Sequence, residues 1–187
     1  MATMENNKTR ETLIEQLNHY EPYNALEGKM LTNMLGFVIN HENCFLRSNL
    51  KGQVTASAWV LDYDHQNVLM LHHTKLDKWL QPGGHTDGNP DVLEVALKEV
   101  EEETGLTTVI SFGDEIFDID VHDIPEYKEV PAHKHYDIRF IFEADMNEPL
   151  VINHESKELK WIPLDEVNNY NDETSILRMV EKTYQIG

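Results

Sequence analysis

The sequence predicts an α/β protein in which a helical N-terminal piece precedes a mixed domain of strands and helices. Residues 9–40 show the three-to-four-residue apolar spacing of helices, and apolar runs typical of strands begin at Val54. A loop rich in glycine, proline and aspartate then leads into a strongly amphipathic helix. We therefore expect a helical extension over residues 1–50, packed on a main domain over residues 51–187.

Two helices are expected in the extension. The first covers residues 9–20, with Leu13, Ile14 and Leu17 on one side. The second covers residues 24–40, and its buried side would carry six apolar residues. These are Leu26, Met30, Met34, Leu35, Phe37 and Val38.

The main domain is expected to alternate strands, turns and helices. Residues 54–73 predict two strands joined by a turn at 62–67, and residues 79–91 predict a long loop. The remaining strand candidates are residues 107–110, 116–122, 135–144 and 159–162. A last helix is expected over residues 173–182, with an apolar side formed by Ile176, Leu177, Met179 and Val180.

Composition narrows the classes of function. The chain has 34 acidic and 15 basic residues and a formal net charge of −19. Such a surface repels nucleic-acid polymers and anionic membranes, so neither is expected as a partner. No apolar run approaches the roughly 18 residues of a membrane span, and the polar N-terminus predicts no signal peptide. With Cys44 as its single cysteine the chain forms no internal disulfide, and the expected location is the cytoplasm.

The helix that follows the glycine-rich loop concentrates negative charge. Asn89 or Asp91 can cap it, Pro90 suits its first turn and Gly105 suits its end. On a helical wheel the buried stripe consists of Leu93, Ala96, Leu97 and Val100. The side that faces water consists of Glu94, Lys98 and Glu101. A third face gathers Glu99, Glu102 and Glu103, whose carboxylates are the hard oxygen ligands that Mg²⁺ or Mn²⁺ prefers.

The loop and helix together resemble the Nudix box, G-x5-E-x7-R-E-U-x-E-E-x-G-U, where U is apolar. The resemblance covers residues 84–106, and the preceding WLQPGG is similar to the usual lead-in to the box. Two positions depart from the pattern. Pro90 stands in place of the family's first glutamate, which braces the loop and helix, so Asp91 or the fixed helix start must do this. Lys98 stands in place of the arginine that orients the neighbouring glutamate, and it keeps the charge without the planar fork.

This resemblance implies a fold and a chemistry. The Nudix fold holds a mixed β-sheet between helices, and its members cleave a diphosphate linked to another group by water attack on phosphorus. By resemblance, Glu99, Glu102, Glu103 and the carbonyl of Gly83 would bind Mg²⁺, with Mn²⁺ as an alternative. The glycines at 83 and 84 allow unusual backbone conformations and close approach to a ligand. The expected substrate is a small anionic nucleotide or nucleoside diphosphate derivative.

A further carboxylate would take the proton of the attacking water. Glu99 is one candidate. Two others, Glu155 and Glu158, lie in NHESKELKWIPLDE, which resembles the Nudix segment that ends in Trp and an apolar–Pro pair. We favour Glu155 because it precedes the expected strand, although either side chain could simply be solvated.

The chain has ten histidines, and some of them are candidates for substrate binding. His85 follows the glycine pair, where it could contact a phosphate or water. In PAHKHYDIRF, His133, His135 and Asp137 alternate with apolar residues and predict one polar strand face, which could bind metal, orient substrate or face water. Arg139 lies on the same face and could pair with substrate phosphate or with Asp137. Together with NCFLRSN and VTASAWVL, HKHYDIRF is similar to a bacterial Nudix subgroup that carries an N-terminal helical extension.

Two other classes compete with the hydrolase. One is a Nudix-fold module that binds a nucleotide without cleaving it; the absent first glutamate favours it and the three box glutamates count against it. The other is an isomerase of the same fold, which needs a cysteine beside the site, whereas Cys44 lies in the N-terminal helical part. The oligomeric state is open, with a homodimer as one option.

Overall fold

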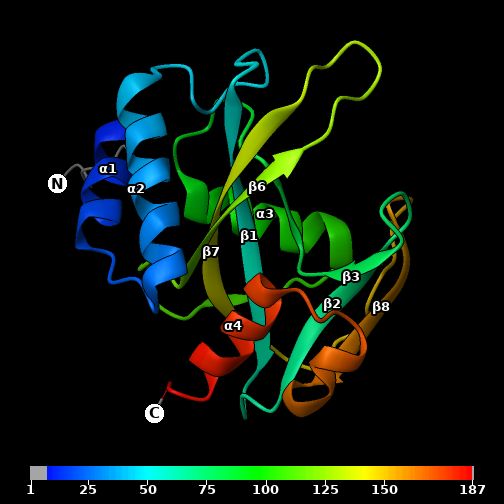
Figure 1. The fold of residues 1–187 in the computed structure, drawn as a ribbon. Coiled ribbons are helices and arrows are strands. Elements are labelled where there is room, and N and C mark those ends of the chain that lie inside the picture. Colours follow the sequence, from blue (N-terminus) through cyan, green and yellow to red (C-terminus); the bar gives the residue numbers. More distant parts are fainter. Residues whose placement is uncertain (1–7, 187) are drawn as a thin grey trace, which may run out of the picture.

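The computed structural model describes residues 8–186 and shows an eight-stranded mixed sheet with helices on both faces (Figure 1). The strands are β1 (Gly52–Asp62), β2 (Asn67–His73), β3 (Lys78–Leu80), β4 (Gly83–His85), β5 (Ile110–Ser111), β6 (Asp118–Ile124), β7 (His133–Ala144) and β8 (Ser156–Pro163). The helices are α1 (Arg10–His19), α2 (Ala25–Asn40), α3 (Val92–Thr104), the short 3₁₀ helix η1 (Leu164–Asn169) and α4 (Thr174–Thr183). The α/β class is confirmed. Residues 1–7 and 187, which the expected domain ranges include, lie outside the described part.

Strands β1 and β7 form the centre of the sheet. They run parallel in continuous register from Gly52 opposite Lys134 to Asp62 opposite Ala144. The strand order is β3-β2-β1-β7-β5, while β4 pairs with β1, β6 with β7 and β8 with β2. The antiparallel pairing of β4 opposite Thr55–Ser57 carries the glycine pair to the middle of β1.

Helices bury both faces of the central strands, which explains why all of β1 is buried. Ala56 and Val60 belong to a core shared with α1, α2 and α3. Trp59 and Leu61, which alternate with them, belong to a second core shared with η1 and α4. In Figure 1, α4 lies in front of the sheet and α3 behind it. The expected arrangement of a sheet between helices is therefore confirmed.

The N-terminal helices pack into the same core as the sheet. A capping box between Thr9 and Thr12 starts α1, and Asn24 caps α2 by accepting from the backbone N–H of Glu27. Leu13 and Leu17 are buried as expected, and so are Met34, Phe37 and Val38. Leu26 does not follow the expectation: it lies in the first turn of α2 and is 48% exposed.

Two short strands lie where the sequence predicts only loop. β3 pairs with β2, and β4 pairs with β1. Conversely, the expected strand at 107–110 is mostly irregular, and only Ile110 and Ser111 pair with β7. In both places the strand state depends on a partner far away in sequence, which local propensity does not report. No helix within residues 8–186 has the length and apolar character needed to cross a bilayer.

Candidate active site

Helix α3 is held at both ends by local features of the sequence. Asp91 is the N-cap, and its carboxylate accepts from the backbone N–H of Glu94 at 3.1 Å. Asn89, the other predicted cap, instead accepts from the N–H of Asp91 and shapes the turn before it. At the other end Gly105 adopts a left-handed φ of 73°, which closes the helix. Asp91 thus fixes the helix start beside Pro90.

The side of α3 that faces the sheet differs from the predicted stripe. Its buried apolar residues are Val92, Val95, Ala96 and Val100. Leu93 and Leu97, expected in the stripe, are only partly buried, whereas Glu103 is buried. The helix turns its glutamate edge toward β4, where glycines leave room for it. Glu101 is exposed as expected.

Two of the three box glutamates contact the glycine pair directly. Glu103 accepts a hydrogen bond from the backbone N–H of Gly83 at 2.9 Å. A Cβ on Gly84 would lie 2.6 Å from the carboxyl carbon of Glu99, so only glycine permits this approach. The φ angles of both glycines are ordinary, so the expected unusual backbone conformation is absent from β4, while close approach is what the packing requires. Glu102 is more exposed and lies 3.4 Å from Lys98.

The carboxylates raise each other's affinity for protons. Burial raises the pKa of Glu103 to about 8 despite the hydrogen bond from Gly83, which lowers it, and the charges of Glu99, Glu155 and Glu102 add to the rise. Burial and the charges of Glu102 and Glu155 also raise the pKa of Glu99. Proximity of these carboxylates therefore disfavours their ionised forms, as at sites that bind cations.

The chemistry of this donor set fits a divalent cation. Four carboxylates whose charges repel one another are hard oxygen donors, and a bound cation would relieve that repulsion. Across residues 8–186, however, no three His, Cys, Asp or Glu side chains already converge as a ready metal site. To share one ion, Glu99, Glu102 and Glu103 would have to adjust their rotamers. The expected ligand role of the Gly83 carbonyl stays a prediction.

Glu155 approaches the box glutamates from a different segment. The loop before β8 is fixed to the end of α3, because Val151 donates its N–H to the carbonyl of Thr104 at 2.8 Å and Asn153 donates to that of Glu102 at 3.3 Å. Glu155 is half-exposed, and its charge contributes to the pKa shifts of Glu99 and Glu103. Glu158, the alternative base, lies in β8 opposite His72.

A cluster of four histidines lies on the adjoining sheet surface. The rings of His85, His122 and His133 have centroids 4.9, 5.5 and 5.2 Å from the ring of His135. Burial and neighbouring positive charge lower the pKa of His135 to about 3 and also lower that of His85. Both rings are therefore neutral at pH 7. The structure thus gathers His85, His133 and His135, which the sequence named as substrate-binding candidates, and adds His122.

Arg139 does not face open space where a phosphate could bind. It is 3% exposed and donates to Asp137 at 2.8 Å and to Asp118 at 3.1 Å. Asp137 in turn accepts from the hydroxyls of Thr55 and Ser57 at 2.8 Å. Of the two roles expected for Arg139, the structure shows the pairing with Asp137. The expected substrate-binding role is wrong, because the guanidinium is buried and already paired with two carboxylates.

The sequence did not point to Arg47 or His122. Arg47 lies in the segment between α2 and β1, and its guanidinium pairs with Asp87 in the loop before α3. His122 pairs with Asp120 at 3.1 Å. The alternation in FDIDVHDI would have placed His122 on the polar face of a strand. No local pattern marks Arg47, because its partner is 40 residues away.

Comparisons with known proteins agree with this architecture. A curated relative, the probable DHNTP pyrophosphohydrolase of Lactococcus lactis subsp. cremoris (strain MG1363), is 27% identical over 113 residues, which is 59% of this chain and 67% of the relative. Among solved structures, a C. elegans Ap4A hydrolase binary complex has a TM-score of 0.57 at 18% identity and covers 71% of this chain and 95% of its own. The E. coli dihydroneopterin triphosphate pyrophosphohydrolase has a TM-score of 0.53 at 18% identity, covering 69% and 92%. At these identities the solved structures show the fold alone.

A family model described as the NUDIX domain matches residues 51–182, well over half of the chain. The match contains the glycine pair, all of α3 and the loop with Glu155, and it begins after α1 and α2. The resemblance carried by the box is thereby confirmed, and the chain belongs to the NUDIX domain family.

Proposed function

We propose that this Nudix pyrophosphohydrolase uses Mg²⁺, with Mn²⁺ as an alternative, to hydrolyse the diphosphate linkage of a nucleotide or nucleoside diphosphate derivative. The observation that carries the proposal is the contact of Glu99 and Glu103 with the glycine pair of β4. The charges of Glu102 and Glu155 lie near enough to add to the raised pKa values of both. Members of the family generally use divalent metal ions. The relatives named above are pyrophosphohydrolases or an Ap4A hydrolase by name, which supports a substrate with linked phosphates.

Each acidic residue has a separate task in this proposal. Glu99, Glu102 and Glu103, with the carbonyl of Gly83, would hold the metal. When bound, the metal supplies positive charge to the phosphate oxygens and lowers the pKa of water. Glu103 keeps its orientation through the N–H of Gly83. Glu155 takes the proton of the attacking water, since its loop is fixed to α3 while its carboxylate is half-exposed.

The histidine cluster would bind the part of the substrate that is not phosphate. His85 and His135 are neutral at pH 7, so their rings offer flat surfaces and hydrogen-bonding nitrogens rather than charge. With His133 they lie on the sheet face reached from the glycine pair through His85. In this proposal the contacts for a ring system would lie next to those for its phosphates.

Replacement of Glu102 tests the hydrolase. A panel of nucleotides and nucleoside diphosphate derivatives is assayed with Mg²⁺ and with Mn²⁺, for the wild type, Glu102→Gln and the matched control Glu101→Gln. We expect Glu102→Gln to lower turnover by on the order of 10²-fold or more, because it removes charge that holds the metal. Glu101→Gln changes an exposed neighbour and is expected to leave turnover within about twofold of the wild type.

A second readout avoids dependence on the substrate. Ligands that bind only the folded protein raise its melting temperature, so millimolar Mg²⁺ should stabilise the wild type and Glu101→Gln more than Glu102→Gln. Equal turnover by wild type and Glu102→Gln would contradict the metal role of Glu102. Tight nucleotide binding without turnover of any panel member would favour the nucleotide-binding module instead.

The isomerase alternative has no support in the structure. Cys44 is fully buried, and burial raises the pKa of its thiol to about 11. A protonated, enclosed thiol is not a nucleophile. A reduced single cysteine agrees with a cytoplasmic location, which we retain as part of the proposal.

A further inference from the structure

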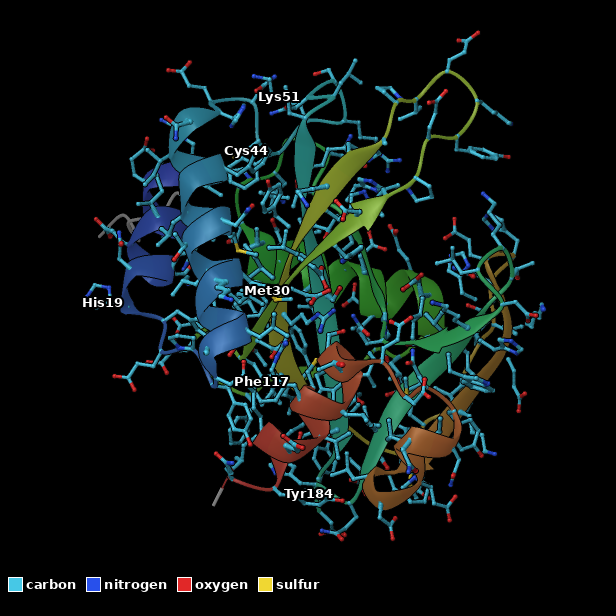
Figure 2. All side chains as sticks on the ribbon, viewed as in Figure 1. His19, Met30, Cys44, Lys51, Phe117 and Tyr184 are labelled. Carbon is cyan, nitrogen blue, oxygen red and sulfur yellow. The ribbon has the colours of Figure 1, made fainter. Side chains whose placement is uncertain are left out.

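The segment between α2 and β1 lies directly on the loop that precedes α3. Cys44 and Lys51 belong to this segment and are both labelled in Figure 2 near the start of β1. The carbonyl of Phe45 accepts from the N–H of Gly88 at 2.8 Å and from the hydroxyl of Thr86 at 3.0 Å. Phe45, which precedes the family match, is thus bonded to the start of the box.

Packing fixes the backbone of this segment on both sides of Arg47. A Cβ on Gly88 would lie 3.1 Å from Leu46, and φ at Gly88 is 91°, so only glycine allows the loop to turn beneath the segment. On the other side Gln53 donates its side-chain amide to the carbonyl of Arg47 at 3.1 Å. The backbone position of Arg47 is therefore set relative to the box, whereas its side chain extends to solvent.

The guanidinium of Arg47 forms a two-pronged pair with Asp87. Its Nε lies 2.5 Å from one carboxylate oxygen and its Nη2 lies 3.0 Å from the other. The two side chains are 62% and 57% exposed. Exposed pairs contribute little to folding stability, so Asp87 can be exchanged for another anion at small cost. The fork that fits a carboxylate fits a phosphate equally well.

Arg47 lies between the two halves of the proposed substrate site. The Asp87 carboxylate that it binds lies two residues after His85 and four before Asp91, the N-cap of α3. The hydrogen bond to Asp87 raises the pKa of the guanidinium, and the charges of Asp87, Glu99 and Glu155 add to the rise. On the other side, its positive charge contributes to the lowered pKa values of His85 and His135. Arg47 thus lies where phosphates would join the group held by the histidines.

We propose that Arg47, supplied by the N-terminal extension, binds a phosphate of the substrate after exchanging the Asp87 carboxylate for phosphate oxygens. This inference rests on the proposed function for the identity of the anion. The need for such a cation follows from the charge of the site. A diphosphate approaches four glutamates in a protein of net charge −19, and Lys98, the basic residue of the box, faces water beside Glu102.

The experiment compares four variants by their affinity for inorganic pyrophosphate at saturating Mg²⁺, measured by calorimetry. Arg47→Ala should weaken binding about tenfold or more, because a charge-assisted fork is lost. Arg47→Lys should fall between it and the wild type, since charge remains without the fork. Asp87→Asn frees the guanidinium and should bind pyrophosphate as tightly as the wild type or more tightly. Lys51→Ala, which removes one exposed charge from the same segment, should change affinity by less than about twofold.

The Asp87 variant separates ligand binding from bracing. If Arg47 only braced the loop, Asp87→Asn and Arg47→Ala would weaken binding alike, and that result would overturn the inference. Unchanged affinity in Arg47→Ala would do the same. With a turned-over substrate, Arg47→Ala should raise KM more than it lowers kcat. If turnover depends on Glu102 but KM does not depend on Arg47, this inference fails and the hydrolase stands. If pyrophosphate binding depends on Arg47 without any turnover, the anion site stands and the hydrolase fails.

Discussion

Gly83 and Gly84 occupy adjacent positions of β4, yet a side chain at each would collide with a different part of the molecule. At Gly83 a Cβ would lie 2.8 Å from the carbonyl oxygen of Ala56 and 2.9 Å from the Cα of Ser57, both of them backbone atoms of β1. At Gly84 it would lie against the carboxyl group of Glu99, the far end of a flexible side chain. Successive residues of a strand face opposite sides of the sheet. The missing side chain at Gly83 therefore allows close packing against β1, and the missing side chain at Gly84 leaves room for Glu99.

Alanine at these two positions should therefore separate activity from stability. Gly84→Ala displaces the Glu99 carboxylate, and we expect turnover to fall by on the order of 10²-fold, as for other misplaced catalytic groups. Its melting temperature should stay close to that of the wild type, because Glu99 can rotate away. Gly83→Ala presses on backbone and should destabilise the fold by about 1–3 kcal/mol. Parallel turnover and thermal-melting measurements check both; a Gly84→Ala protein as active as wild type would show that Glu99 tolerates displacement.

At the scale of residues, the sequence predicted what one helix or strand face can reveal. Glu99, Glu102 and Glu103 follow from the spacing on one helix, and the polar stripe of His133, His135 and Asp137 follows from alternation. The burial of Arg139 could not be predicted from such spacing. Its carboxylate partners lie on two strands, and burial of the guanidinium depends on α4 packing over it.

Helix α3 shows how the chain manages without the first glutamate of the box. Pro90 fixes the backbone just ahead of the helix, and Asp91 supplies the carboxylate that accepts from the first turn. Asn89 adds two more hydrogen bonds, accepting from the N–H of Asp91 and donating to the carboxylate of Glu94 at 2.8 Å. The start of the helix is thus defined by local bonds, and the direction of its glutamates toward β4 follows from that start.

Loss of the cap should loosen the helix start. Asp91→Ala leaves the N–H of Glu94 without its acceptor and should lower the free energy of unfolding by about 1 kcal/mol. Asp91→Asn keeps an acceptor oxygen and should stay within a few tenths of a kcal/mol, roughly the spread among good caps. Denaturant unfolding of both proteins tests this, and equal losses in the two would indicate that the carboxylate acts through its charge rather than as a cap.

The prediction of elements succeeded where periodicity is long and failed where it is short. The helices and the long strands β1, β2 and β7 carry many residues of one pattern. β3 and β4 have three residues each, too few for any period, and they exist through pairing with β2 and β1. The sequence therefore predicted a loop at the glycine pair, although both glycines lie in β4 and pair with β1.

Across the whole molecule, a buried network of charges joins the N-terminal extension to the last helix. Glu27 of α2 is fully buried and accepts from Lys182 of α4 at 2.7 Å. Lys182 also donates to Asp118 of β6 at 2.7 Å, and Arg178 donates to Asp118 at 2.8 Å. Phe117, labelled in Figure 2 between α2 and α4, offers its carbonyl to Lys182 at 3.1 Å. The extension outside the family match is thus bound into the domain by charged hydrogen bonds and by shared core.

Asp118 is the centre of this network, and its removal should be severe. Asp118→Asn leaves Arg139, Arg178 and Lys182 with one fewer buried counter-charge, and breaking such a set costs about 3–5 kcal/mol. Asp114→Asn, four residues earlier and exposed, removes the same formal charge and should change the free energy of unfolding by less than about 0.5 kcal/mol. Chemical denaturation measures both values.

The pH dependence of the same variant reveals whether the charge of Asp118 is responsible. Burial alone would raise the pKa of Asp118, but the hydrogen bond from Arg178 and the charges of Arg139 and Lys182 hold it below its ordinary value of 3.8. The unfolded chain therefore takes up this proton first as pH falls, and the stabilisation is complete above pH 3.8 and is lost below it. The gap in unfolding free energy between wild type and Asp118→Asn should be constant near neutral pH and should shrink as the pH falls through the folded pKa. If this difference begins to shrink at a pH well above 3.8, a group other than Asp118 provides the stabilisation. If it persists in strong acid, the stabilisation arises from shape and packing rather than from charge. Loss of the difference only below pH 3.8 would show that ion pairs of Asp118 hold the extension, β6 and α4 together.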